Sequence, residues 1–452
     1  MDRLLRELNM DKVGQELYEL TERLYPICRS ITGNGVRETL RIISEQIPIE
    51  VHEVPSGTQV FDWVIPKEWN IRDAYIKNSR GEKIVDFKNS NLHVLSYSTP
   101  VKGKFTLEEL KEHLFTLPDH PEWIPYFTSY YRESWGFCLT HKQYEGLEDG
   151  EYEVLIDSTL EDGSLTYAQL LLEGDIEDEV LLSTYICHPS MCNDNLSGVA
   201  LLTTLAKYLK DIKLKHSYRF LFIPETIGSI TWLSRNEVEA FKIRHGLVAT
   251  CVADSGTSTY KRTRNGNALI DKIVEKVLID SDSPYEIIDF APTGADERQF
   301  CYPGFNLSVG SLMRTPYVCY EQYHTSADDL SFIDPESFAD SLEKYLGAIY
   351  IIEHNATYVN SGPKCEPQLG KRGLINAIGG QKDGKVDEMP IFWVLNFSDG
   401  TYSLLDIAVR SGVNFKYIKA AADALLSKNL LVKVDEHQTN PRMWSGSLNL
   451  ST

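Results

Sequence analysis

Residues 181–209 read LLSTYICHPSMCNDNLSGVALLTTLAKYL, which predicts a strand, a short turn and a helix in that order. The apolar run from Leu181 to Ile186 is typical of a buried parallel strand. After the turn, apolar residues recur every three or four positions, as on the buried face of a helix: Val199, Leu202, Leu205 and Leu209. The pattern favours an open α/β sheet with helices packed against it.

The turn holds His188 and Asp194, two residue types that bind zinc. In open α/β sheets, ligands bind where the chain leaves the carboxyl end of a strand, and this turn lies at such a position. Cys187 and Cys192 flank His188 and are either further ligands or buried thiols. A second interpretation stays open here: Asp194 or Asn195 caps the helix, and His188 is a hydrogen-bonded loop residue.

The composition is that of a soluble globular protein of two or three domains, with 452 residues, 42% apolar and 24% charged. There are 45 basic and 65 acidic residues, and the net charge of −20 disfavours nucleic acid and anionic membranes as partners. The start, MDRLLRELNMDKVGQEL, does not resemble a signal peptide, and no membrane span is expected. The eight scattered cysteines predict reduced thiols in the cytoplasm.

Periodicity and composition divide the chain into an α/β domain, an inserted module, a linker and a C-terminal domain. The α/β domain is expected over residues 1–54 and 161–360, and residues 55–160 interrupt it with short alternating segments that predict a β-rich module. The module's aromatic cluster is either core or a lid over a substrate: Trp123, Tyr126, Phe127, Tyr130, Tyr131 and Trp135. Residues 361–385 are the predicted linker, and residues 386–452 the last domain.

The α/β domain contains five predicted strands, mostly separated by helical segments: residues 167–174, 179–188, 219–223, 246–253 and 305–309. This alternation predicts a mostly parallel sheet flanked by helices. Asp334 and Pro335 predict the start of a helix that runs to about His354, because aspartate is a favoured N-cap and proline a favoured first helical residue.

The last domain has the order of a winged helix. An apolar segment, IFWVLNF, precedes predicted helices over residues 403–410 and 415–428 and the strand LLVKV. Residues 386–434 contain five basic and five acidic residues, so this span has no net charge to attract phosphates. We therefore expect the domain to pack against protein, either another copy of the chain or a different partner, and not to bind nucleic acid.

Polar residues gather at the predicted carboxyl edge of the sheet: His188, Asp194, Glu225, Asp254 and His324. One carboxylate at a strand end is common, but two histidines and three carboxylates at the same edge favour a metal site over helix caps and surface groups.

Four segments together resemble the zinc aminopeptidases typified by bacterial leucyl aminopeptidase, aminopeptidase Y and glutamate carboxypeptidase. They are the NDNLSG turn at 193–198, the ETIGS segment at 225–229, Asp254, and the HTSAD segment at 324–328. The resemblance covers roughly residues 166–355, and it implies that the β-rich module is a lid-like insertion. With this module and the winged helix, the chain is most similar to the aminopeptidase-like proteins associated with bacterial surface-polysaccharide biosynthesis.

The resemblance implies zinc ligands at His188, Asp194, Asp254 and His324, with Asp194 shared by two ions. Two departures affect this expectation: Pro189 and Ser190 follow His188 in place of the family's H-x-D, and Thr226 falls where the family has a second glutamate ligand. We therefore expect one tight zinc ion held by Asp194, Asp254 and His324, and a second site that is weak or empty.

The same resemblance implies that Glu225 acts as the general base and that Tyr323 helps to stabilise the oxyanion. The alternative for Glu225 is a carboxylate that interacts with a helix N-terminus. Arg314 is either a contact for a substrate carboxylate or a surface arginine. Arg29, on the turn RSITGNG, is likewise either an anion contact or a surface residue.

The predicted function is that of a cytoplasmic, zinc-dependent hydrolase of the aminopeptidase type, acting on an amide bond in a small peptide or an aminoacylated sugar. Two rival functions remain: acyl transfer or cyclisation on the same one-zinc scaffold, and a non-catalytic metal-binding role in the assembly of polysaccharides. Thr226 and the winged helix favour the second rival.

Overall fold

The structure is a computed structural model that describes residues 1–374 and 388–434. The chain forms two compact units, one of residues 1–275 and 283–346 and the other of residues 276–282 and 347–452. The predicted linker and the end of the predicted winged helix lie partly outside the described residues. In the described part of the chain, no helix combines the length and apolar character needed to cross a membrane.

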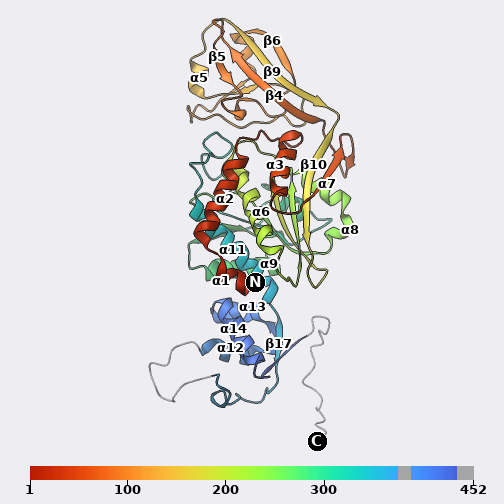
Figure 1. The fold of residues 1–452 in the computed structure, drawn as a ribbon, viewed down its shortest axis with the longest axis vertical. Helices are drawn as coiled ribbons and strands as arrows, with labels where there is room; N and C mark the ends of the chain where they lie inside the picture. The colour runs from red at the N-terminus through yellow and green to blue at the C-terminus, as the bar shows by residue number, and fades with distance from the viewer. Residues whose placement is uncertain (375–387, 435–452) are drawn as a thin grey trace. The chain divides into compact units, whose positions relative to one another are not determined.

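The first unit is built on an eight-stranded mixed sheet (Figure 1). Its spatial order is β1 (Glu50–Pro55), β10 (Ser164–Leu172), β12 (Ser217–Ile223), β11 (Glu179–Tyr185), β13 (Ile243–Ala249), β16 (Val309–Met313), β14 (Ser258–Lys261) and β15 (Tyr285–Ile288). The four central strands β12, β11, β13 and β16 run parallel, whereas β1, β10 and β14 join by antiparallel pairing. Every residue of β11 and β12 is buried, as expected for central parallel strands with both faces covered.

The α/β class is confirmed, but several sequence-based details are wrong. The strand predicted over residues 305–309 begins where that prediction ended, at Val309, and the strand predicted over 246–253 ends at Ala249. The short strands β14 and β15 were missed, because four residues carry too little periodicity to identify a strand. Strand β10 pairs with β12, a pairing for which the sequence gave rise to no prediction.

The helices of the chain outside the inserted module and the winged helix are α1 (Asp2–Glu7), α2 (Met10–Leu24), α3 (Asn34–Ser44), α6 (Ser197–Leu209), α7 (Ile227–Arg235), α8 (Glu237–Ala240), α9 (Leu269–Asp280), α10 (Glu297–Phe300) and α11 (Pro335–His354). Helix α6 follows the turn after β11 as predicted, and it is buried over nearly its whole length. The start of α11 agrees with its predicted cap, because Asp334 Oδ1 accepts a hydrogen bond from the Ser337 N–H at 2.8 Å.

The chain between β1 and β10 forms a β-rich module whose four-stranded antiparallel sheet, in the order β5-β4-β9-β6, is separate from the main sheet (Figure 1). The module comprises β2 (Gln59–Val60), β3 (Trp63–Val64), β4 (Glu68–Lys77), β5 (Lys83–Asp86), β6 (Val101–Thr106), α4 (Leu107–Lys111), β7 (Leu114–Phe115), β8 (Phe137–Cys138), α5 (His141–Glu145) and β9 (Glu151–Glu161). Burial alternates along the first part of β9, which is the period-two pattern of a strand with one covered face.

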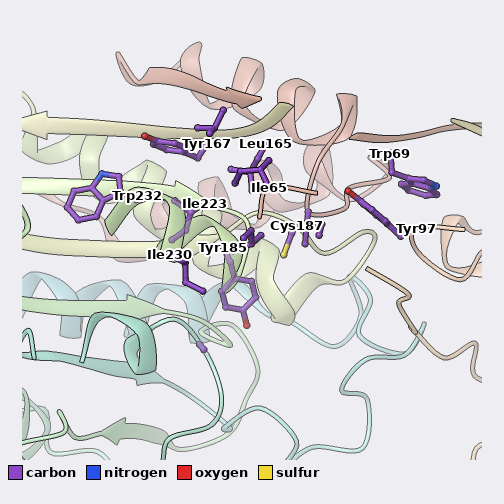
Figure 2. Packing of buried hydrophobic residues seen from close by; sticks show 14 of the residues in the cluster. Ile65, Trp69, Tyr97, Leu165, Tyr167, Tyr185, Cys187, Ile223, Ile230 and Trp232 are labelled. Carbon is purple, nitrogen blue, oxygen red and sulfur yellow. The ribbon is translucent and has the colours of Figure 1, made fainter. Parts of the chain in front are cut away.

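One continuous apolar cluster joins the module to the main sheet. Figure 2 shows Tyr185 and Ile223 of the sheet in the same cluster as Ile65, Trp69 and Tyr97 of the module. An ionic contact adds to this attachment, since Arg37 on α3 pairs with Glu53 on β1 and with Glu68 on β4. The module is therefore packed directly on the domain that carries the candidate site.

The second unit contains the winged helix. Helices α12 (Met389–Phe397), α13 (Leu404–Ser411) and α14 (Phe415–Leu426) accompany a three-stranded sheet of β17 (Thr357–Asn360), β18 (Asp399–Ser403) and β19 (Leu431–Lys433). The predicted helices at 403–410 and 415–428 correspond to α13 and α14. The apolar segment IFWVLNF, which had no predicted state, is part of α12, a helix apolar on nearly every side.

Candidate metal centre

The candidate site lies where the central parallel strands end. His188 and Asp194 follow β11, Glu225 follows β12, and His324 lies between β16 and α11. His188 and Asp194 are buried, whereas the side chains of Glu225 and His324 are 27% and 33% exposed. The site is therefore buried on the side of His188 and Asp194 and open to a ligand on the side of Glu225 and His324.

Three of the four predicted metal ligands converge. Asp194 Oδ2 lies 3.3 Å from His188 Nδ1 and 3.0 Å from His324 Nε2. Donor atoms of these three residues all lie within 4.8 Å of one another, so they form a candidate metal-binding group. Asp194 Oδ2 and His324 Nε2 are buried, and among the described residues they form ion pairs within this group without a hydrogen bond of good geometry. Buried imidazole and carboxylate atoms that face one another in this way fit a zinc ion.

The structure does not bring Asp254, the fourth predicted ligand, into this group. Its Oδ2 accepts hydrogen bonds from Asn193 Nδ2 at 3.0 Å and from the Thr315 N–H at 3.2 Å. Its Oδ1 accepts from the Gly256 N–H at 2.8 Å and from the Thr315 hydroxyl. β13 ends at Ala249, so Asp254 lies on the following loop, where its oxygens accept from Gly256 nearby and from Asn193 and Thr315, each 61 positions away in sequence. The group that the structure brings together is His188, Asp194 and His324.

Glu225 lies on the other side of His188. Its Oε2 is 3.4 Å from His188 Nε2, and its backbone N–H donates to Cys187 Sγ at 3.3 Å. Cys187, His188 and Glu225 form a second candidate donor group, but burial raises the pKa of the Cys187 thiol to about 12. Burial therefore favours the neutral thiol of Cys187 in the absence of a metal ion.

The charges within the site are strongly coupled. Burial alone would raise the pKa of Asp194, but His188 and His324 hold the pKa of that carboxyl well below its usual range. Burial would likewise lower the pKa of His188, yet the carboxylates of Asp194 and Glu225 raise it well above its ordinary value. Because a metal ligand must be a neutral imidazole, metal binding here would release a proton.

Asp328 and Arg29 hold the backbone around His188 and Asp194 by hydrogen bonds. Asp328 accepts the backbone N–H groups of Asn193 at 2.6 Å and of Asp194 at 2.9 Å, and burial raises the pKa of Asp328 to about 7. Arg29 is buried, and its guanidinium donates to the carbonyl oxygens of His188 at 2.7 Å and Pro189 at 3.0 Å. Both interpretations of Arg29 from sequence are wrong, since it is a buried support for the His188 turn.

The remaining predicted residues have different surroundings. The Tyr323 ring stacks on that of His324, with centroids 3.9 Å apart, and so borders the site. Arg314 donates to the Asp340 carboxylate and to the Ser337 carbonyl oxygen. The structure therefore does not bring the Arg314 charge into the metal group, and a carboxylate of the protein already neutralises it.

Two contributors near the site were missed from sequence. Tyr126 of the inserted module places its ring 5.3 Å from that of His188 and 5.1 Å from that of His324, and its N–H donates to the His324 carbonyl oxygen at 2.7 Å. Asp296 accepts the Thr226 N–H at 2.8 Å and the Ser229 hydroxyl at 2.7 Å. Tyr126 was one aromatic among six in its stretch, and Asp296 follows β15, a strand that was itself missed from sequence, so neither carried a distinguishing signal.

Comparison with known proteins gives the same picture of the fold. A relative from Clostridium acetobutylicum, named as a candidate polysaccharide biosynthesis protein with an aminopeptidase-like domain, is 60% identical over 423 residues, covering 94% of this chain and 97% of the relative. A crystal structure of a candidate peptidase from C. acetobutylicum is also 60% identical, with a TM-score of 0.90, and the match covers 94% of this chain and 98% of that one.

More distant structures share the fold of the first unit. A zinc aminopeptidase from Bacillus subtilis has a TM-score of 0.55 at 11% identity, covering 75% of this chain and 95% of that one. A peptidase M28 precursor from Shewanella amazonensis has a TM-score of 0.52 at 12% identity, covering 76% and 96%. The aminopeptidase-like fold inferred from the sequence motifs is thus confirmed.

Two family models match the chain. The model described as a domain of unknown function, DUF4910, matches residues 18–355, and that of a winged helix-turn-helix matches residues 356–433. The chain therefore belongs to the DUF4910 family, with an aminopeptidase-like domain followed by a winged helix-turn-helix.

Proposed function

We propose that the chain is a zinc-dependent hydrolase that cleaves an amide bond in a small peptide or an aminoacylated sugar. The observation that carries this proposal is the buried group of His188, Asp194 and His324, in which Asp194 Oδ2 lies 3.3 Å and 3.0 Å from the two imidazoles, beside the carboxylate of Glu225. A buried group of imidazole and carboxylate donors beside a partly exposed carboxylate is typical of a metallohydrolase site.

We propose that His188, Asp194 and His324 hold one zinc ion. A second ion is not expected, because donors within the protein saturate Asp254 and because Thr226 offers only a hydroxyl. When bound, zinc would supply a Lewis acid that makes water more acidic and the amide carbonyl more electrophilic.

Glu225 is the proposed general base. Its carboxylate is partly exposed at the open side of the site and lies within 3.4 Å of a ligand imidazole, where it can accept a proton from water and pass it to the leaving amine. Tyr323 is the proposed donor to the oxyanion. Burial, together with the charges of Asp194 and Glu225, raises the pKa of Tyr323, so its hydroxyl keeps a proton to donate.

The biological setting follows from a relative and not from the site itself. Because the C. acetobutylicum relative is named for polysaccharide biosynthesis, we propose the same setting for this chain. A cytoplasmic location, and protein contacts through the winged helix, remain predictions from the sequence.

A substrate screen with a matched pair of variants tests this function. The zinc-loaded protein is assayed against aminoacyl 4-nitroanilides and aminoacylated amino sugars, with Glu225→Gln as the test variant and Glu237→Gln, on α8, as the control. We expect hydrolysis to fall by about 10²- to 10⁴-fold in Glu225→Gln while zinc content is unchanged, as for loss of a general base. Full activity of Glu225→Gln, or no hydrolysis by the unaltered protein, would contradict the proposal.

A further inference from the structure

Arg298 reaches toward the site from α10. Its Nη2 donates to the Thr226 hydroxyl at 2.7 Å, and Thr226 directly follows Glu225. Thr226 has φ of 63°, a left-handed conformation that β-branched residues rarely adopt, and Asp296 holds its N–H at 2.8 Å. Strained backbone of this kind is concentrated at functional sites, where the surrounding structure must hold it in place.

The guanidinium of Arg298 carries a charge that no carboxylate of the described residues neutralises. Its hydrogen bond to Thr226 is the single hydrogen bond made by its side chain in the described part of the chain, and its Nε is buried without a hydrogen-bond partner. Asp296 Oδ1 accepts from Thr226 and Ser229, and Glu297 Oε1 from Lys261 at 2.7 Å, whereas Asp296 Oδ2 and Glu297 Oε2 have no hydrogen-bond partner among the described residues.

Three other arginines in the unit have carboxylate partners, unlike Arg298. Arg219 pairs with Glu179, Arg314 with Asp340, and Arg37 with two glutamates. A partly buried cation without a counter-ion is unfavourable, and it becomes favourable when a ligand supplies the missing anion. Arg298 is therefore suited to bind an anionic group that enters beside Glu225.

We propose that Arg298 binds a carboxylate of the substrate and selects amides that carry an acidic group next to the cleaved bond. This inference rests on the proposed function, because it places that carboxylate beside the base that acts on the amide. A planar guanidinium can bind a carboxylate through two parallel hydrogen bonds. A carboxylate fits better than a phosphate monoester, because the single charge of one guanidinium matches one negative charge, whereas a phosphate monoester carries close to two.

The test uses dipeptide amides, in which the terminal carboxylate is blocked and a side chain carries the only acid. Binding of Glu-Ala-NH₂ and Gln-Ala-NH₂, and of Ala-Glu-NH₂ and Ala-Gln-NH₂, is measured by calorimetry on the metal-free protein, and kcat/KM on the zinc-loaded protein. For at least one pair, we expect the acidic peptide to bind about tenfold or more tightly than its amide counterpart, as for a hydrogen bond between charged groups.

Variants assign this preference to Arg298. Arg298→Met should remove the preference and leave binding of the neutral peptide within about twofold, and Arg298→Lys should keep only part of it because lysine lacks the planar fork. Arg264→Met is the matched control, since Arg264 also pairs with a neutral acceptor, Asn306, and lies on the surface. It should leave the preference intact.

Several outcomes would overturn the inference. They are the absence of acid preference in the unaltered protein, an unchanged preference in Arg298→Met or Arg298→Lys, and displacement of the acidic peptide by millimolar inorganic phosphate. The proposed function is tested separately. Acid-selective binding without hydrolysis would refute the hydrolase and support the role of Arg298. Hydrolysis without acid preference would support the hydrolase and refute the role of Arg298.

Discussion

The turns after β11 and β13 each contain an aspartate, but the two aspartates have different surroundings. Each places a buried aspartate beyond the end of a central parallel strand, Asp194 in one case and Asp254 in the other. Asp194 has one oxygen bonded to the Tyr185 hydroxyl and one oxygen without a hydrogen-bond partner among the described residues. Asp254 has both oxygens taken up by Asn193, Gly256 and Thr315. An aspartate at a strand end is thus available to a metal only where the nearby backbone and side chains leave an oxygen free.

The largest effects that sharpen this comparison are expected at the histidines that face Asp194. His188 Nδ1 and His324 Nε2 lie at nearly the same distance from Asp194 Oδ2, so replacing either histidine with alanine should weaken zinc binding. The loss of affinity should exceed the about 10- to 100-fold that is typical when a residue outside the ligand set is replaced. Zinc affinity is measured by competition with a chelator. His120→Ala, in the inserted module, is the control, and full zinc affinity in either ligand variant would break the comparison.

A smaller effect, on stability, is expected from Asp296, a third carboxylate at the same edge. Burial and the charge of Glu225 raise the pKa of Asp296 to about 7. The folded state therefore holds this proton more tightly than the unfolded state, and stability should fall as pH rises from about 4 to about 7. Asp296→Asn removes this titration.

The measurement is the difference in free energy of unfolding between the unaltered metal-free protein and Asp296→Asn across that pH range. As pH rises, the unaltered protein should become less stable relative to Asp296→Asn. A difference that is constant with pH would mean that Asp296 is ionised throughout, like Asp194.

The smallest effect is expected in the second unit, where charges balance. Residues 386–434 carry five basic and five acidic residues, and ion pairs such as Lys419–Asp423 use some of them. Binding to duplex DNA should therefore be undetectable at physiological salt, because little phosphate charge can be neutralised. A gel-shift titration of the full chain tests this, and DNA binding that disappears on deletion of residues 386–452 would contradict it.

The sequence was sufficient where a signal is local and repeated. The mainly apolar segments of β11 and β12 identified buried strands of a parallel sheet, the spacing of α6 identified a helix, and the turn between β11 and α6 identified His188 and Asp194. The NDNLSG and HTSAD motifs led to the aminopeptidase-like fold. Each of these inferences depends on residues close together in the chain.

It was insufficient where the outcome depends on partners distant in sequence. Asp254 is bonded to Asn193 and Thr315, each 61 positions away, so no local pattern separates it from a metal ligand. The contact of Arg298 with Thr226 spans 72 positions. Arg29, assigned to the surface or to an anion, is buried because its turn packs under the His188 loop.

Zinc binding by Asp194→Asn and Asp254→Asn, measured side by side, tests the central claim most directly. Both variants remove one buried negative charge at the same edge of the sheet, and they differ in whether an oxygen faces the histidines. The account predicts that Asp194→Asn no longer retains zinc after dialysis, whereas Asp254→Asn keeps close to one ion per chain with affinity lowered by at most about 10- to 100-fold. Equal loss of zinc in the two variants, or loss in Asp254→Asn alone, would contradict it.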